Sequence, residues 1–338
     1  MRLHLGYVPL CDAAPLIAAA EMGFGREEGL DLDLSAEPSW ATLRDRLALG
    51  YLDAAHMLAP LALASAVGLS GPPADLAVPL GLSLNGNAVT LSKPLWDAMA
   101  APDDGLESVA SALARVAADR RALGRSLTLG TVHPFSSHTY QLHHLLKRGG
   151  LDLSAIRLVA VPPQHSVEAL ARGLVDGFCA GAPWNGVAVA AGIGRIAALG
   201  CEIVPDCPEK VLALSNRLGG AALPLVRAVA RAGLWCGESA NRMELAHRLA
   251  RRSYLGQDAG LIARCLEGEI IVDSAGRQRS APDYIRLGAA AQRPSPDQAR
   301  WLFAEMAAAG QVPPGPDLRE AVDGVYRPDL FEAAEPGA

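Results

Sequence analysis

Apolar and polar positions alternate along this chain in short blocks, which predict strands and helices in turn. Residues 3–8 have the period of a strand, a helix is expected over about 13–22 before Gly23, and a second strand is expected over about 30–36. Strands that alternate with helices are typical of an α/β fold. Such a fold has mainly parallel sheets joined by helical crossovers.

The segment over residues 37–60 carries the clearest local signals. Ser39 is expected to cap a helix whose apolar face has the spacing i, i+3 and i+7 from Trp40, and Gly50 is expected to end it. A short strand of small residues then ends at His56. Ligands of α/β sheets bind beyond the carboxyl ends of strands. Trp40 and His56 therefore either face one pocket or are ordinary core residues.

Two segments of the chain share one pattern. Residues 47–54 and 170–177 both read Leu-Ala-x-Gly-x-apolar-Asp-small, in which glycine stops a helix and aspartate opens the next strand. The repeat predicts two similar α/β lobes. The elements expected in the second lobe are strands over about 126–131, 156–161 and 176–180, with helices over about 137–148 and 167–172.

Two extended segments, 87–91 and 211–215, are interpreted as the crossings between the lobes. Lobe I is then discontinuous, with residues 1–92 plus 206–338, and its part beyond residue 218 is mainly helical. Lobe II is the insertion over residues 93–205. Two crossings permit a hinge and a ligand cleft between the lobes.

Composition narrows the class of protein. Of 338 residues, 50% are hydrophobic and 20% are charged, which is typical of a globular chain with a large core. A net charge of -6 argues against a direct nucleic-acid partner. The apolar runs are interrupted or too short to span a bilayer, so no membrane insertion is expected.

Two features bear on the cellular compartment. The first residues already alternate as a strand, without the basic leader and apolar stretch of a signal peptide, which predicts a cytoplasmic protein. A leader that has been trimmed from the chain is the alternative. Six cysteines without CxxC spacing indicate reduced thiols rather than a disulfide framework or a zinc site.

The sequence lacks the motifs of nucleotide-binding proteins, serine hydrolases and zinc peptidases, namely GxxxxGKS/T, GxSxG and HExxH. His138 and His143 are spaced i, i+5 on a predicted helix, which points their rings apart and disfavours a metal site. We therefore predict no catalytic residue, no metal and no cofactor.

Two loops of the second lobe follow predicted strands and carry candidate ligand-binding groups. His133 comes just after the strand that ends at residue 131, and Pro134 keeps it out of helical geometry. Pro183 and Trp184 follow the strand over 176–180 in the same way. Both loops lie at the carboxyl ends of strands, where ligands of α/β sheets collect.

Three further candidates lie at the ends of the crossings. The turn at Asn85 and Gly86 can expose N–H donors, although a plain turn has the same sequence. Lys210 is one of only three lysines among 30 basic residues and lies on the returning crossing. It is interpreted either as a cation that faces the cleft or as a surface lysine paired with Glu209.

Taken together, the motifs of the chain resemble the nitrate- and bicarbonate-binding proteins of ABC transporters and, more closely in layout, the cytoplasmic nitrate/nitrite sensors of NasS type. The resemblance covers residues 5–214. It implies the two-lobed periplasmic-binding-protein-like fold of type II. Its motifs are, in order, LGYVPLCDAAPL, EPSWATLRD, LDAAHMLAP, LNGNAVTLS, VPP, GAPW and CPEKVLAL.

The resemblance also implies a site that holds a small oxyanion between the lobes. The matching positions here are Trp40, Asn85, His133 and Lys210, and possible neighbours are His56, Gly86, Pro183 and Trp184. Nitrate is a planar anion with three acceptor oxygens and suits a set of N–H donors. Bicarbonate would need an additional acceptor for its own proton, for which the sequence offers only His56.

By this resemblance, the chain is expected to be a cytoplasmic sensor. It would bind nitrate or nitrite and release an ANTAR-type RNA-binding antiterminator protein, thereby controlling nitrate-assimilation genes. The first alternative is the substrate-binding component of an ABC transporter for nitrate or another small oxyanion. The second alternative is an enzyme on the same fold, similar to a thiamine-pyrimidine synthase, although no activated nucleophile pair is evident.

Overall fold

The computed structural model describes residues 1–151, 153–315 and 317–334 and divides the chain into two compact units. The first unit contains Met1–Leu84, Pro208–Ala259 and Arg286–Ala338. The second unit contains Asn85–Cys207 and Gly260–Ile285. Among the described residues, no helix combines the length and the hydrophobicity that a membrane crossing requires.

The first unit is built on a six-stranded sheet with the order β13-β4-β10-β3-β1-β2. Strand β1 is parallel to β2 and β3, whereas β10 is antiparallel to β3 and β4. The sheet is therefore mixed, where the sequence predicted a mainly parallel one. The strands are β1 (Arg2–Tyr7), β2 (Asp31–Ala36), β3 (Ala54–Leu58), β4 (Leu76–Asn85), β10 (Pro208–Ser215) and β13 (Ile285–Arg286).

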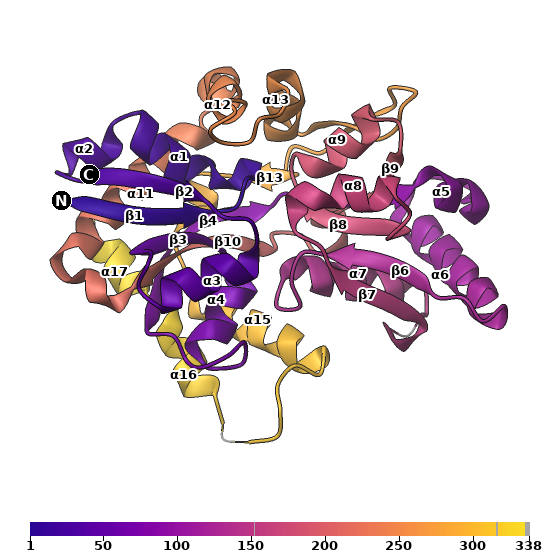
Figure 1. Ribbon diagram of the computed structural model, residues 1–338, viewed down its shortest axis with the longest axis horizontal. Coiled ribbons are helices and arrows are strands. Elements are labelled where there is room, and N and C mark those ends of the chain that lie inside the picture. The colour runs from indigo at the N-terminus through magenta and orange to yellow at the C-terminus, as the bar shows by residue number, and fades with distance from the viewer. Residues whose placement is uncertain (152, 316, 335–338) are drawn as a thin grey trace. The chain divides into compact units, whose positions relative to one another are not determined.

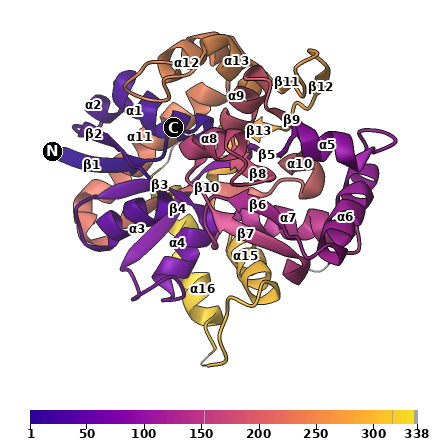
Figure 2. The same ribbon diagram turned by 45° about the vertical axis from the view of Figure 1, so that its right-hand side comes forward.

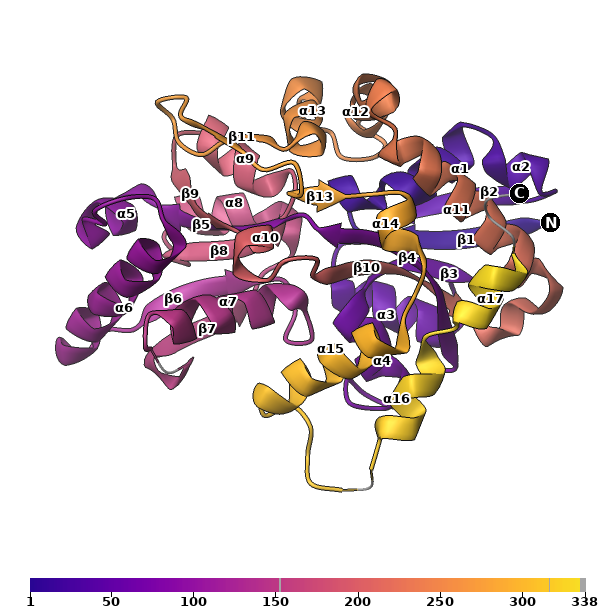
Figure 3. The same ribbon diagram turned by 180° about the vertical axis from the view of Figure 1, so that it is seen from behind.

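Helices cover both faces of this sheet. Figure 1 and the view from behind in Figure 3 show α1 and α11 on one side of the strands and α3 and α4 on the other. The C-terminal helices α15 and α16 pack against α4, and α17 packs against α11. The α-helices are α1 (Ala14–Glu21), α2 (Phe24–Glu27), α3 (Trp40–Ala48), α4 (Ala59–Ala66), α11 (Ala222–Gly237), α12 (Arg242–Leu249), α14 (Ala289–Gln292), α15 (Pro296–Ala308), α16 (Arg319–Val325) and α17 (Pro328–Ala333). Short 3-10 helices are η1 (Cys11–Ala13), η4 (Asn216–Ala221) and η5 (Ser239–Asn241).

The second unit has a five-stranded mixed sheet with the order β7-β6-β8-β5-β9. Strand β6 is parallel to β7 and β8, and β5 is antiparallel to β8 and β9. Both sheets are mixed because the strands next to the unit borders, β10 and β5, run against their neighbours. The strands are β5 (Asn87–Ser92), β6 (Leu127–Thr131), β7 (Ile156–Ala160), β8 (Gly177–Gly181) and β9 (Gly194–Leu199), with a separate hairpin of β11 (Glu269–Ile271) and β12 (Gln278–Ser280).

Helices also cover both faces of the second sheet. Figure 2 shows α8 and α9 on one side and α6 and α7 on the other. Apolar residues of α5, α6 and α7 form one buried cluster with residues of β5, β6 and β8. The helices are α5 (Lys93–Met99), α6 (Leu106–Ala122), α7 (Ser137–Arg148), α8 (Ser166–Ala171), α9 (Trp184–Ala190), α10 (Gly200–Ile203) and α13 (Ala259–Glu267), with 3-10 helices η2 (Leu153–Ala155) and η3 (Pro163–His165).

The repeated sequence pattern has the same structural role in both units. In the first unit the Asp53 carboxylate accepts the His4 N–H at 2.7 Å, and the Asp53 N–H donates to the His4 carbonyl at 2.8 Å. In the second unit Asp176 makes the same two bonds to Thr128, at 2.9 and 2.8 Å. Each aspartate thus clamps the start of one strand to its parallel neighbour, which confirms the predicted similarity of the two halves.

The segment Gly260–Ile285 belongs to the second unit, whereas the sequence assigned it to the helical tail of lobe I. A backbone bond joins Ile196 to Val272 at 2.9 Å, and Arg277 pairs with Asp104 at 2.7 Å. Arg195 also pairs with Asp273 of this segment. Bonds between residues so distant in sequence leave no local pattern, and this assignment could therefore not be predicted from the sequence.

Candidate functional site

Polar side chains of the first unit gather where its parallel strands end. Asp12 lies in η1 after β1, Trp40 starts α3 after β2, and His56 lies on β3. The antiparallel strand β10 adds Lys210, which pairs with Leu58 in the register of β3. Because paired positions share a face of a sheet, His56 and Lys210 lie on the same face, two positions apart. The topology thus collects four polar or aromatic side chains at one edge.

Local sequence signals fix the position of Trp40. The Ser39 hydroxyl accepts the Thr42 N–H at 3.1 Å and caps α3, as predicted. The expected apolar face of Trp40, Leu43 and Leu47 is buried. Gly50 adopts the left-handed conformation with φ of 80° that ends helices in this way. The cap, the face and the stop are therefore all confirmed.

A buried cluster of charged groups surrounds Lys210. The Lys210 ammonium lies 2.9 Å from a carboxylate oxygen of Asp12 and 2.6 Å from one of Glu209. The second Asp12 oxygen lies 2.8 Å from Nε2 of His56. At most 1% of any of these four residues is exposed. Glu209 is thus the partner that the surface interpretation of Lys210 named, but both residues are fully buried.

Burial and pairing shift the pKa values in this cluster. Burial alone would raise the pKa of Asp12, but the Lys210 ammonium and the His56 hydrogen bond lower it to about 2. Burial lowers the pKa of His56, against the opposing effect of Asp12. Burial also acts to lower the pKa of Lys210, but the Asp12 and Glu209 carboxylates outweigh it and raise that pKa. Asp12 and Lys210 are accordingly ionised at neutral pH, and the His56 ring is neutral.

This cluster contains polar atoms whose hydrogen-bonding capacity the protein does not use. Among the described residues, the Trp40 indole N–H, the Ser83 hydroxyl and His56 Nδ1 are buried and have no hydrogen-bond partner. Ser83 is the register partner of Lys210 on β4. A lysine ammonium has three N–H donors, and Asp12 and Glu209 accept from two of them. A buried donor or acceptor without a hydrogen-bond partner lowers the stability of the fold unless a further molecule supplies that partner.

The unused atoms differ in their chemistry. The indole N–H is a donor, and the Ser83 hydroxyl and the third N–H of Lys210 can also donate. His56 Nε2 donates its proton to the ionised Asp12 carboxylate, so Nδ1 of the neutral ring is an acceptor. The Trp40 ring lies 5.5 Å from the His56 ring and 5.5 Å from the Lys210 nitrogen. The arrangement offers several donors and one acceptor beside the Lys210 ammonium and its two carboxylate partners.

In the second unit, His133 and Trp184 lie at one edge of the sheet. His133 follows β6, Pro183 and Trp184 follow β8, and β6 and β8 are parallel neighbours. Nδ1 of His133 accepts the Phe135 N–H at 3.1 Å, which leaves the proton of the neutral ring on Nε2. The prediction that these loops occupy the carboxyl ends of strands is confirmed, and their contact with an anion stays a prediction.

Asn85 and Gly86 hold segments of the second unit together. The Asn85 amide donates to the Asp283 carbonyl and accepts the Cys207 N–H, both at 2.9 Å. Asn85 has a positive φ of 60°, and the Gly86 carbonyl accepts the Ala182 N–H at 2.9 Å. Both ends of the Asn85 side chain thus have a structural use, and its predicted role in anion binding stays a prediction.

The structure brings together Trp40, His56 and Lys210 in the first unit, and it adds two residues that the sequence interpretation missed. Asp12 is the only charged residue in the apolar stretch over residues 5–20, and an isolated charge of that kind could have identified it. Ser83 lies inside the buried strand β4 and had no such signal. No group of three or more metal-binding side chains occurs in the described part of the chain.

The model of the NMT1-like family matches residues 1–250. The chain belongs to the NMT1-like family. This NMT1-like chain is 32% identical over 342 residues to the nitrate import ATP-binding protein NrtC of Synechocystis sp. (strain PCC 6803), covering 99% of this chain and 50% of NrtC. It is 33% identical over 343 residues to the bicarbonate transport ATP-binding protein CmpC of Synechococcus elongatus, covering 99% of this chain and 49% of CmpC. The chain spans about half the length of these relatives.

A solved structure matches almost the whole NMT1-like chain. The periplasmic nitrate-binding protein NrtA from Synechocystis PCC 6803 superposes with a TM-score of 0.90 at 26% sequence identity. The match covers 98% of this chain and 88% of NrtA. It confirms the predicted periplasmic-binding-protein-like fold. NrtA is a binding protein, in agreement with the prediction that this chain is not an enzyme.

Proposed function

We propose that this chain binds nitrate or nitrite as the substrate-binding part of an ABC-type import system. The proposal is supported by the likeness to NrtA over almost the whole chain and by the likeness to the transport protein NrtC. The chain has no phosphate-binding GxxxxGKS/T motif. We therefore assign it to the part of the longer ATP-binding relatives that does not hold ATP.

The observation that carries this proposal is the set of unused donors around Lys210. Within the described part of the chain, the Trp40 indole N–H and the Ser83 hydroxyl are buried without hydrogen-bond partners, next to an ammonium with an unused N–H. A small oxyanion would accept hydrogen bonds from these donors, which would supply the partners that they lack. The Trp40 ring would exclude water from the site, which strengthens each of these bonds.

Bicarbonate is the second candidate ligand, and a specific atom favours it. Nδ1 of the neutral His56 ring is an unpaired acceptor, and bicarbonate carries a proton that it can donate to such an atom. Nitrate has no proton to donate. A nitrate complex would leave Nδ1 unpaired or would require His56 to take up a proton.

Titration calorimetry of the purified chain with nitrate, nitrite, bicarbonate and chloride tests the proposal. We expect nitrate or nitrite to bind at least about ten-fold more tightly than chloride, since a spherical ion cannot accept from several fixed donors equally well. Repeating the titration in buffers of different ionisation enthalpy measures the protons taken up or released. An absence of binding for all three oxyanions would refute the proposal. Binding of bicarbonate alone would show that bicarbonate, and not nitrate or nitrite, is the ligand.

We also propose, as a second function, that the chain acts in the cytoplasm as a sensor. Its support is the resemblance of the seven motifs to those of sensors of NasS type, a resemblance that extends to the binding proteins of ABC transporters. In this role the chain binds an ANTAR-type RNA-binding antiterminator and releases it when nitrate or nitrite binds. An anion that shifts this equilibrium must bind the two states with affinities that differ by roughly 10- to 100-fold.

Co-elution experiments separate the sensor from the transport component. The chain is mixed with a purified ANTAR-type antiterminator and passed over a sizing column, with and without nitrate. The sensor role predicts a complex that nitrate dissociates, whereas no complex under either condition would contradict it. Fractionation of native cells tests the proposed cytoplasmic location directly.

A further inference from the structure

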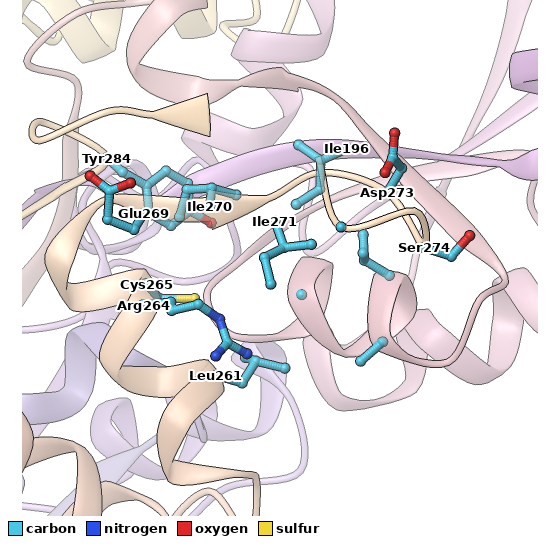
Figure 4. A pocket seen from close by; sticks show the side chains of 14 residues that line it. Ile196, Leu261, Arg264, Cys265, Glu269, Ile270, Ile271, Asp273, Ser274 and Tyr284 are labelled. Carbon is cyan, nitrogen blue, oxygen red and sulfur yellow. The ribbon is translucent and has the colours of Figure 1, made fainter. Parts of the chain in front are cut away.

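A cavity of about 260 Å³ lies within the second unit, and none of the predicted anion-binding residues lines it. Helices α9 and α13, strands β9 and β11 and the turn after β11 form its walls (Figure 4). Its volume is just below the ~300 Å³ at which binding pockets for small molecules begin. The cavity therefore suits a ligand larger than nitrate and smaller than a nucleotide.

The walls of this cavity are mainly apolar. Ile196 of β9, Leu261 of α13 and Ile270 of β11 are buried, and Ile271 is half-buried beside the exposed Ser274. Apolar walls of this kind gain free energy when they cover an apolar group. The cavity thus favours a ligand with a hydrocarbon or aromatic body.

The two acidic residues in the walls already have partners. Asp273 pairs with Arg195 and accepts the N–H groups of Ala275 and Arg277 at 3.1 Å. Glu269 accepts the Ser280 hydroxyl at 2.8 Å. Neither acid is therefore an open site for a cationic ligand.

The basic residue in the walls differs from the acids. Arg264 is half-buried on α13, and among the described residues its guanidinium makes neither a hydrogen bond nor an ion pair. Figure 4 shows its side chain next to Leu261 on the side of α13 that faces the cavity. The neighbouring Cys265 thiol stays protonated at neutral pH because burial raises its pKa to about 12. Arg264 is thus the one charged side chain of the cavity that has no partner in the described structure.

We propose that this cavity binds a small organic monoanion, with a carboxylate head on Arg264 and an apolar body against Ile196, Leu261 and Ile270. A guanidinium can donate two parallel hydrogen bonds to a carboxylate, which fixes the head as well as neutralising it. The site is independent of the proposed nitrate site, because the Lys210 cluster belongs to the first unit. Nitrate lacks the apolar body that these walls would cover.

Matched pairs of probes separate the charge from the apolar body. Phenylacetate and hexanoate are titrated into the full chain, together with their neutral amides, and binding is followed by ligand-observed NMR. We expect both carboxylates to bind, and to bind at least about ten-fold more tightly than their amides. Saturating nitrate should leave carboxylate binding unchanged. Competition by nitrate would place the carboxylates in the nitrate site and overturn the proposal.

Two variants test the role of Arg264. Arg264→Gln keeps the length and polarity of the side chain but removes its charge, so carboxylate affinity should fall at least about ten-fold while amide affinity stays unchanged. The control is Arg125→Gln, which removes an exposed arginine of the same unit that does not line the cavity. Equal carboxylate affinity for the wild type and Arg264→Gln, or no binding of either carboxylate at millimolar concentration, would overturn the proposal.

Discussion

Lys210 has a structural role besides its proposed contact with an anion, because its ammonium pairs with two carboxylates. Its ammonium is the common partner of Asp12 and Glu209, and all three groups are buried. Removal of one member of a buried ion pair typically costs about 3–5 kcal/mol, because the remaining charge has no compensation. Lys210→Ala would therefore lower the stability of the fold as well as the affinity for any anion that binds here. Donors without a partner inside the protein are better probes of the site.

Trp40→Phe is the cleaner test at the scale of a single residue. It removes the indole N–H, which has no partner among the described residues, and keeps an aromatic ring in the same place. We expect nitrate affinity to fall about ten-fold, or roughly 1.4 kcal/mol, because one hydrogen bond to a buried anion is lost. The midpoint of urea unfolding without anion should fall as well, because the smaller ring leaves a void at a fully buried position, and this loss is measured separately from the loss of affinity. Calorimetry and urea unfolding measure the two effects.

The matched control for this substitution is Trp301→Phe, in α15 of the same unit. It removes an indole N–H outside the cluster and should leave nitrate affinity unchanged. If Trp40→Phe binds nitrate as tightly as the wild type, the indole N–H does not contact the anion.

Residue types explain which members of the cluster the sequence could predict. Trp40 and His56 were found because local signals place them at a helix start and near a strand end, and Lys210 because lysine is rare in this chain. His56 and Lys210 both contact Asp12 because β3 pairs with β10, although the two strands lie about 150 residues apart in the sequence. No local pattern encodes such a pairing. Asp12 and Ser83 were missed for that reason.

At the scale of elements, the backbones of β4 and α14 lie very close to each other. Gly81 lies on β4, and a Cβ atom there would come within 2.0 Å of the Ala291 carbonyl oxygen. Backbone atoms cannot move aside as the end of a side chain can. Strand β4, which carries Ser83, can therefore lie this close to α14 only because residue 81 has no side chain.

Gly81→Ala should therefore destabilise the protein. Overpacking of this kind costs about 1–3 kcal/mol or more, because the strand or the helix must shift. The free energy of unfolding in urea measures this loss. The control is Gly220→Ala, where a new Cβ would meet no atom within 4 Å and should have little effect. Equal stability of the two variants would show that β4 and α14 can separate without cost.

The directions of the strands were harder to predict than their existence. The structure has strands over Leu127–Thr131 and Ile156–Ala160, close to the ranges predicted from periodicity. Alternation with helices implied parallel pairing, and this holds for β6 with its two neighbours. Strands β5 and β10 break the rule because each enters its sheet directly after the chain passes from the other unit, and not through a helical crossover within one sheet.

The stability of the whole molecule should depend on pH through His56. Burial lowers the pKa of His56 in the folded state, so at pH values just below its ordinary value near 6.5 the unfolded chain binds more protons. Stability is then lost as the pH falls below about 6.5. Asp12, with its pKa lowered to about 2, causes a further loss of stability only below about pH 4.

Between pH 6.5 and 4.5, His56→Gln should reduce the dependence of unfolding free energy on pH. The difference in slope is at most about 1.4 kcal/mol per pH unit, the value for one proton. Glutamine retains a donor for Asp12, so the hydrogen bond is kept. Urea unfolding at a series of pH values measures the slopes, with the exposed His247→Gln as control. Parallel curves for the wild type and His56→Gln would contradict the assignment of this proton to His56.

The separation of β3 and β10 along the chain also sets an order of events during synthesis. Lys210 follows His56 by 154 residues, so a ribosome that adds about 5–20 residues per second delivers it roughly 10–30 s later. All five strands of the second sheet are made within that interval. The second sheet can therefore assemble while the first still lacks its central strand and Asp12 still lacks its cation. The half of the protein that begins first is completed last.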